Sequence, residues 1–198
     1  MNNNYLPSDY QTFIATSRYA RWLDDEGRRE TWGETVERYL ENIAKTWLKP
    51  VDLQEVRDAI LSLEVMPSMR SMMTAGKAAD RDNTCMYNCS YLPVDDPKSF
   101  DEAMFILLCG TGVGFSVERQ FITKLPDVPT LFQSETCVVI KDSKEGWAKG
   151  LRQVLALLWA GEIPKWDVSK VRPAGARLKT FGGRASGPAP LIDLFNFA

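Results

Sequence analysis

The 198-residue chain has a formal net charge of −2, with 44% hydrophobic and 25% charged residues. This balance is typical of a soluble globular protein of one or two domains, and it gives no overall attraction to nucleic acid. No apolar run reaches the roughly 18 residues of a membrane-spanning helix, so we expect neither a nucleic-acid nor a membrane partner. The sequence contains no histidine, which excludes Ser–His catalysis and mixed Cys/His zinc sites.

The chain has four cysteines, Cys85, Cys89, Cys109 and Cys137. Their spacing is irregular and lacks the close pairs of zinc ribbons, so we expect no metal site among them. Without an N-terminal secretory signal, they predict a reducing, cytoplasmic compartment and free or catalytic thiols.

Residues 1–64 predict a small helical domain. Thr31 and Glu34 form a capping box that begins a helix, and Pro50 is expected to end it. The next helix opens at Asp52. The apolar stripes of the two helices are Trp32, Val36, Leu40, Ile43 and Trp47 in the first, and Leu53, Val56, Ile60 and Leu63 in the second. We interpret these stripes as packing surfaces and nothing more.

Residues 66–96 join a Met-rich apolar patch to a polar loop that contains two cysteines and ends at Asp95 and Asp96. Asp, Arg and Asn residues beside thiols and aromatic rings indicate a site rather than a core. The alternative is a turn leading into a strand with Cys85 and Cys89 buried, because a free cysteine behaves as a small hydrophobe.

Ser99 and Glu102 predict the cap of a third helix, which is apolar nearly all round and is therefore expected to be buried. It leads into the sequence GTGVGFSV, a Gly-rich turn followed by an alternating strand. Such a turn indicates that the backbone comes close to a ligand or to another strand.

Residues 137–140 predict a short buried strand, and Asp142 with Glu145 predicts the cap of a long helix that stops at Gly161. The alternation of strands and helices from residue 112 onward indicates an α/β architecture.

The last segment is basic and rich in turn residues. Its cations are Lys170, Arg172, Arg177, Lys179 and Arg184. Such a run can bind an anion through its charges and backbone N–H groups, or it can be a solvated loop.

Five ordered stretches run from about Tyr19 to the C-terminus. They are RYARWLDDEGRRETWGETVERYL, MPSMRSMMTAG followed by NCSYLPVDD, GTGVGFS, DSKEGW and RPAGARLKTFGGRASGP. Together they resemble the large catalytic chain of ribonucleotide reductases, most closely the adenosylcobalamin-dependent class II. Five motifs in the family's order are specific, whereas any one alone would not be.

The resemblance implies a fold in which the helical domain, 1–64, precedes the first portion of a ten-stranded α/β barrel, 65–198. The family's radical-bearing cysteine, the second reducing cysteine and the C-terminal thiol pair have no counterpart here. We therefore expect an N-terminal piece that is active only when the remaining C-terminal portion completes it, whether it is a truncated, split-gene or incomplete sequence.

The resemblance also assigns residues. Cys89 corresponds to one of the two cysteines that reduce the ribose 2′ position, and Asp96 to the site of a deoxynucleotide effector. The implied substrate-binding positions are Ser68, Asn88, Thr111 and Gly112. Cys85, Cys109 and Cys137 match no family role, so we expect them to be buried thiols.

The implied activity is the conversion of ribonucleotides to 2′-deoxyribonucleotides by thiyl-radical chemistry. Its cofactor is adenosylcobalamin, which this chain alone is not expected to bind, and its partners are the substrate, the effector and a thioredoxin-like reductant. Three alternatives stay open: a nucleotide-binding or regulatory fragment without activity, a class I large subunit with a separate metal-containing radical subunit, and a structural α/β domain with inert thiols.

Overall fold

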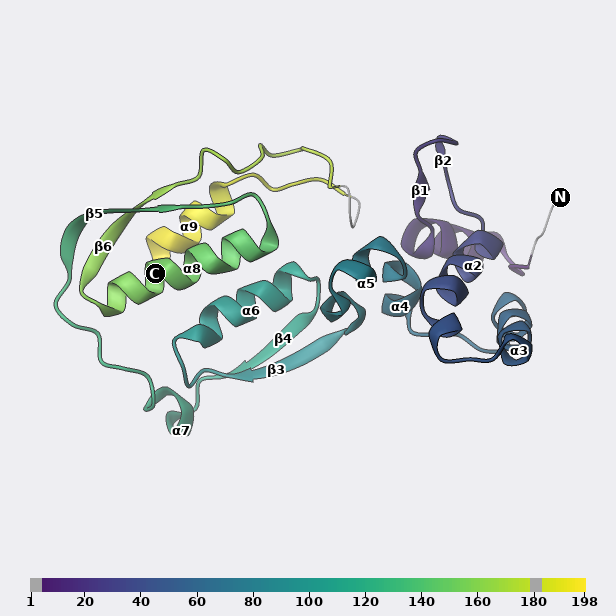
Figure 1. The fold of residues 1–198 in the computed structure, drawn as a ribbon, viewed down its shortest axis with the longest axis horizontal. Coiled ribbons are helices and arrows are strands. Elements are labelled where there is room, and N and C mark those ends of the chain that lie inside the picture. The colour runs from purple at the N-terminus through teal and green to yellow at the C-terminus, as the bar shows by residue number, and fades with distance from the viewer. Residues whose placement is uncertain (1–4, 179–182) are drawn as a thin grey trace. The chain divides into compact units, whose positions relative to one another are not determined.

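The computed structural model describes residues 5–178 and 183–198, so Lys179 of the basic segment lies outside the described residues. Contacts divide the chain into two compact units, Met1–Tyr87 and Asn88–Ala198 (Figure 1). Residues 65–87 thus group with the helical unit, and the predicted domain boundary after residue 64 stays a prediction. No helix within the described ranges is long and apolar enough to cross a membrane.

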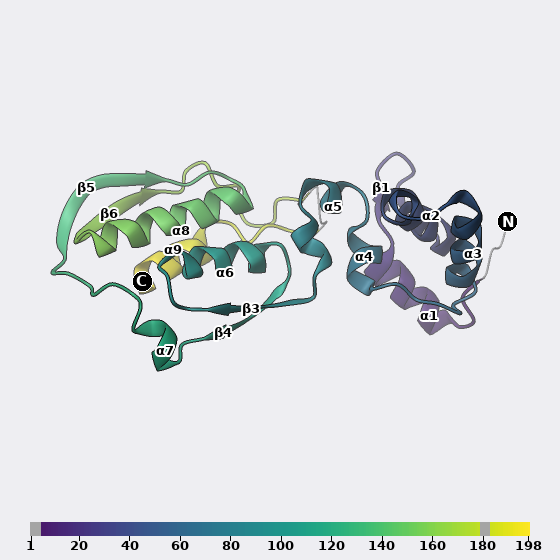
Figure 2. The ribbon, with the colours of Figure 1, turned by 60° about the horizontal axis from the view of Figure 1, so that its bottom comes forward.

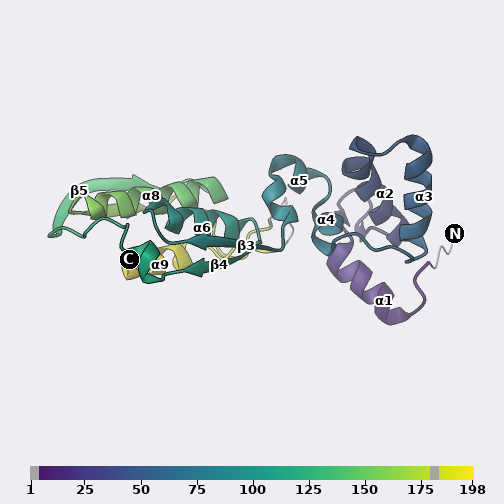
Figure 3. The same ribbon diagram turned by 90° about the horizontal axis from the view of Figure 1, so that it is seen from below.

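The first unit is mostly helical. Its elements are α1 (Asp9–Ile14), the π-helix η1 (Ala15–Tyr19), β1 (Trp22–Leu23), β2 (Arg28–Arg29), α2 (Trp32–Asn42), the 3-10 helix η2 (Ala44–Thr46), α3 (Pro50–Leu61), α4 (Met69–Thr74), α5 (Lys77–Arg81) and the 3-10 helix η3 (Asn83–Met86). The strands β1 and β2 form a short antiparallel hairpin. The helices α2 and α3 pack against each other (Figure 3).

The capping box that begins α2 is confirmed, because the Thr31 side chain accepts from the backbone of Glu34 and the Glu34 side chain accepts from the backbone of Thr31. The predicted end of this helix is wrong. α2 ends at Asn42, and Trp47 is 83% exposed rather than buried. Pro50 begins α3 instead of ending α2, since the first turn of a helix has no partner for the N–H that proline lacks.

A buried ion pair links α2 to the end of α4. Arg38 Nε donates to Glu30 Oε1 at 2.8 Å, and Arg38 Nη1 donates to the carbonyl oxygens of Met72 at 2.9 Å and Ala75 at 3.0 Å. Burial alone would raise the pKa of Glu30, but the hydrogen bonds from Arg38 and from the backbone of Arg21 outweigh it and lower that pKa. Arg38 thereby supplies a hydrogen-bond donor to two backbone carbonyls at the end of α4.

The second unit alternates strands and helices, which confirms the α/β expectation. Its elements are β3 (Cys89–Pro93), α6 (Lys98–Leu108), β4 (Gly112–Ser116), α7 (Arg119–Ile122), β5 (Phe132–Val139), α8 (Lys144–Trp159), β6 (Glu162–Asp167) and α9 (Ala189–Phe197). β3 pairs in parallel with β4, and β5 pairs in parallel with β6. Each pair is joined by a helix, α6 or α8, so the unit contains two βαβ segments (Figure 2).

The core of this unit lies around α8. Its buried members are Val138, Ile140, Leu151, Val154, Val171, Leu191 and Phe195. The cap of α8 is Ser143, whose Oγ accepts from the N–H of Gly146 at 3.0 Å, and not the predicted Asp142. The predicted stop at Gly161 is confirmed, because this glycine follows the helix with a φ of +89°.

Two burial expectations are wrong. The helix α6 exposes Phe100, Leu107 and Leu108 by 39%, 56% and 38%, because neighbouring elements cover only part of its surface. Its N-cap is Pro97, and the hydroxyl of Ser99 donates to the carbonyl of Pro93 at 3.1 Å. Residues 137–139 of the predicted strand belong to the longer β5, and Ile140 follows it; Val138 is buried, whereas Cys137 is exposed.

Candidate active site at the amino ends of β3 and β4

Four of the predicted site residues meet where β3 and β4 begin. Cys89 pairs in register with Gly112. The N–H of Gly112 donates to the carbonyl oxygen of Asn88 at 2.9 Å, and Thr111 directly precedes β4. Segments that are distant in the sequence are thus adjacent at one end of a parallel strand pair.

The turn after α6 determines this arrangement. Gly110 has a φ of +83°, a conformation that suits glycine, and its N–H donates to the carbonyl of Leu107 at 2.8 Å. The N–H of Thr111 donates to the carbonyl of Ile106 at 3.3 Å, which completes a Schellman motif. Thr111 is only 2% exposed. The backbone of Thr111, which the resemblance places near the substrate, is therefore held in place by this turn.

An open strip of surface adjoins Cys89. Cys89 is exposed and shares one face of β3 with Tyr91, which is 64% exposed. Their in-register partners are Gly112 and Gly114, which carry no side chains. A Cβ at these two glycines would lie 3.5 Å and 3.6 Å from the nearest backbone oxygen, which is ordinary contact. Packing within the described chain therefore does not require glycine there, and the strip is free to receive another group.

Tyr91 and Gly114 were not among the predicted site residues. The signal that could have identified them is the two-residue period of a strand, which places residues 89 and 91, and residues 112 and 114, on one face.

Asp96 lies beyond the opposite end of β3 from Cys89. Its Oδ1 accepts from the N–H of Lys98 at 2.8 Å, at the start of α6. The pKa of Arg152 is raised, chiefly by the hydrogen bond to Asp101 and to a smaller degree by the charges of Glu102 and Asp96. The five residues of β3, at about 3.3 Å each, keep Asp96 well away from the thiol.

Ser68 belongs to the first unit, where it is exposed and precedes α4. Its carbonyl accepts from the N–H of Met72 at 2.9 Å. Its role in substrate binding stays a prediction.

The other three cysteines differ in exposure. Cys85 and Cys109 are buried, as expected, with no exposed surface. Cys137 is exposed, so the expectation that it is buried is wrong. None of the four forms a disulfide within the described residues. Lys144 Nζ donates to Cys109 Sγ at 3.1 Å.

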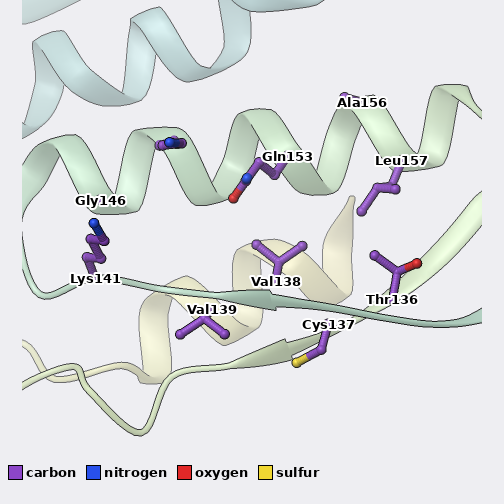
Figure 4. A pocket seen from close by; sticks show the side chains of 10 residues that line it. Thr136, Cys137, Val138, Val139, Lys141, Gly146, Gln153, Ala156 and Leu157 are labelled. Atoms are coloured by element: carbon purple, nitrogen blue, oxygen red, sulfur yellow. The ribbon is translucent and has the colours of Figure 1, made fainter.

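Two hollows border α8. One, of about 600 Å³, lies between β5 and α8; Figure 4 shows Val138 pointing toward the helix and Cys137 pointing to the other side of the strand. The second, of about 610 Å³, lies between α6 and α8 and includes Asp101 and Arg152. Neither of the two is lined by Cys89, so the open strip, rather than a hollow, carries the candidate chemistry.

The basic segment is partly paired. Arg172 Nε donates to Asp142 Oδ2 at 2.7 Å, which joins the DSKEGW and RPAG stretches. This contact places one of the candidate anion-binding cations in an internal ion pair.

Comparisons with known proteins find similarity to ribonucleotide reductases. A family model described as B12-dependent ribonucleotide reductase, insertion domain, matches residues 123–197. Adenosylcobalamin-dependent ribonucleoside-triphosphate reductases of Lacticaseibacillus paracasei and Euglena gracilis are 29% and 28% identical over 255 and 200 residues. A putative reductase of the same name from Mycobacterium phage D29 is 28% identical over 214 residues. Each match covers 89% of this chain and 33%, 27% and 30% of the relative, respectively.

A crystal structure of a B12-dependent, class II ribonucleotide reductase has the same fold over 93% of this chain and 36% of its own, with a TM-score of 0.77 and 23% identity. The resemblance inferred from the five motifs is therefore confirmed. The chain spans about a third of the length of the curated relatives it matches.

Proposed function

We propose that this chain is the N-terminal part of an adenosylcobalamin-dependent ribonucleotide reductase that converts ribonucleoside triphosphates to 2′-deoxyribonucleotides. The observation that supports it best is the exposed thiol of Cys89 beside Asn88, Thr111 and Gly112 at one strand end. The names of the relatives favour adenosylcobalamin over a metal-containing radical subunit, and triphosphate over diphosphate substrates.

The reaction replaces the ribose 2′-hydroxyl with hydrogen and releases water, while two thiols become a disulfide. Cys89 supplies one of these thiols, and a cysteine in the remaining C-terminal portion supplies the other. A thioredoxin-like reductant restores the pair by thiol–disulfide exchange, as expected in the cytoplasm.

Adenosylcobalamin, when bound, supplies the radical, and among the described residues we assign none to holding it. The open strip fits the substrate side of this chemistry, because it leaves the Cys89 thiol accessible and places two residues without side chains, Gly112 and Gly114, next to it. The buried Thr111 holds the backbone that borders the sugar.

The proposal includes the ten-stranded barrel and the domains 1–64 and 65–198. β3 and β4 are suited to be its first strands, because they are parallel and each pairs with one neighbour within the described residues. The region from β5 to α9 coincides with the match to the insertion-domain model.

Replacement of Cys89 in the complete enzyme tests the function. We expect Cys89→Ser to abolish deoxynucleotide formation and to retain nucleotide binding, because serine preserves the shape but cannot give up electrons. Cys137→Ser is the matched control, since Cys137 is also an exposed thiol on a parallel strand. The measurements are product chromatography and equilibrium binding of the ribonucleotide.

Turnover by Cys89→Ser at the normal rate would remove Cys89 from the reaction. A complete wild-type protein that binds nucleotide and forms no product with adenosylcobalamin and a dithiol would favour the regulatory alternative.

The effector assignment is tested at Asp96. We expect Asp96→Ala to weaken the response to deoxynucleotides by up to about 100-fold, since allosteric coupling is typically about 1–3 kcal/mol, while basal turnover persists. Asp95→Ala is the control, because Asp95 forms an ion pair with Lys124 at 3.1 Å. Equal effector titrations for the wild type and Asp96→Ala would remove Asp96 from the effector site.

A further inference from the structure

A buried thiol and an amine are in direct contact at the junction of α6 and α8. Lys144 Nζ lies 3.1 Å from Cys109 Sγ and 4.8 Å from the centre of the Phe105 ring. Cys109 has no exposed surface, and Lys144 is half-buried. An ammonium beside a sulfur favours the thiolate, which is the form that reacts with oxidants.

The fold holds both groups in place. Cys109 caps the C-terminus of α6, where its N–H donates to the carbonyls of Phe105 and Ile106. Lys144 is the first residue of α8, directly after the capping Ser143. The helices α6 and α8 pack against each other along their lengths (Figure 2). The contact therefore joins two helix ends that are far apart in the sequence.

We propose that Cys109 and Lys144 form a reversible sulfenamide cross-link when hydrogen peroxide oxidises the thiol. In the first step the thiolate attacks one peroxide oxygen. An S–O bond forms, the O–O bond breaks, and the hydroxide that leaves takes a proton from the ammonium to give water. The sulfur is oxidised by two electrons, and the peroxide is reduced.

In the second step the neutral amine attacks the sulfenic acid. The Sγ–Nζ bond forms, the S–O bond breaks, and a second water leaves with a proton from the nitrogen. One thiol, one amine and one hydrogen peroxide thus give one sulfenamide and two waters. A dithiol reverses the link by reducing the sulfur and releasing the amine.

The location selects this pair among the four cysteines. A sulfenic acid at exposed Cys89 or Cys137 is open to external thiols. At Cys109, burial excludes large thiols and places the Lys144 amine in contact. Hydrogen peroxide is close to water in size, so it can reach the sulfur along the half-buried side chain of Lys144 when the first turn of α8 opens briefly.

The link would stiffen the turn that carries the candidate active site. Cys109 is followed by Gly110 and Thr111, which lead into β4. We expect the cross-linked enzyme to lose turnover and to regain it with a dithiol. This consequence rests on the proposed function, whereas the link itself does not.

Peptide mapping of the purified protein after peroxide treatment tests the link. We expect the peptides of Cys109 and Lys144 to appear joined, two hydrogen masses below their sum, and to separate with dithiothreitol. Unmodified Cys109 after full oxidation of Cys89 and Cys137 would overturn the proposal. So would a Cys109 found only as sulfinic acid, or a link that retains oxygen.

Two variants identify the amine. Lys144→Arg keeps the positive charge but removes the primary amine, so we expect no link and a Cys109 that oxidises further. Lys149→Arg changes an exposed lysine of the same helix and should link as the wild type does. A dithiol-reversible link in Lys144→Arg would overturn the assignment. The map of the unaltered protein decides the question even where a variant fails to fold.

Discussion

The β3–α6–β4 and β5–α8–β6 segments have the same topology but bury different residues. In the second segment the buried core is apolar and includes Ile140, Val154 and Leu151. In the first, α6 and its flanks bury Ser99, Asp101 and two residues at the helix end, Cys109 and Thr111. The β5–α8–β6 segment thus packs with α9 around an apolar core, whereas the β3–α6–β4 segment buries polar groups and leaves apolar side chains of α6 exposed.

This difference indicates where chemistry can take place. In the β5–α8–β6 segment the core is tightly packed where Ile140 meets Gly150 on α8, since a Cβ at Gly150 would lie 2.3 Å from Ile140 Cδ1. The face of β3 and β4 that carries Cys89 and Tyr91 is uncovered and partly built of glycine. The candidate site therefore lies on a face of the unit that the apolar core around α8 does not cover.

The largest effect should come from removing core volume in the second segment. We expect Ile140→Ala to lower the free energy of unfolding by about 2–5 kcal/mol, because it leaves a cavity at a side chain with no exposed surface. Val113→Ala, at a half-buried position of β4, should cost less than half as much. Hydrogen exchange of the α8 and α6 amides reports each segment separately. Equal losses in the two variants would contradict the comparison.

The sequence predicts local structure well where a few neighbouring residues determine it. The Thr31–Glu34 capping box and the stop at Gly161 are examples, since each depends on interactions within a few residues. Burial of α6 was predicted wrongly because apolar content does not say how many neighbours a helix has. That number depends on long-range packing, which leaves Leu107 56% exposed.

The functional residues, too, fall into those that the sequence could predict and those that it could not. The resemblance selected Asn88, Cys89, Thr111 and Gly112, and the parallel register of β3 and β4 brings them together. The contact between Cys109 and Lys144 could not be predicted, because it needs α6 and α8 to pack in one particular register. The spacing of apolar residues along one helix carries no information about a contact between two helices.

A smaller effect should come from the ion pair that joins the two segments. Asp101 is 3% exposed; its Oδ2 accepts from Arg152 Nε at 2.9 Å, and its Oδ1 has no hydrogen-bond partner within the described chain. We expect Arg152→Ala to destabilise by about 1–3 kcal/mol, since it leaves a buried carboxylate without its donor. Asp101→Asn should cost less than about 1 kcal/mol, because Arg152 is half-exposed and its charge is already screened. Urea unfolding of both variants checks the order, and a larger loss for Asp101→Asn would reverse the argument.

The smallest effect on stability should come from one type of substitution, glycine to alanine, made once in each segment. This pair of variants is also the most direct test of the comparison. Gly150→Ala adds a methyl group against the buried Ile140 side chain, and this overpacking, about 1–3 kcal/mol, exceeds or cancels the gain of about 1 kcal/mol from helix propensity. Gly114→Ala meets only the carbonyl of Ser90 at 3.6 Å, so the free energy of unfolding should stay the same or rise by about 0.5–1 kcal/mol.

Gly150→Ala should have the larger effect on stability, whereas Gly114→Ala should have the larger effect on activity. Gly114→Ala narrows the open strip beside Cys89, so we expect a raised KM for the ribonucleotide in a stable protein. Gly150→Ala should keep the KM and lower the melting temperature. Steady-state kinetics and thermal unfolding of the same preparations give both quantities. A Gly114→Ala variant with unaltered kinetics would show that the strip does not contact the substrate. In that case we would expect the β3–β4 face to pack against another strand of the complete enzyme.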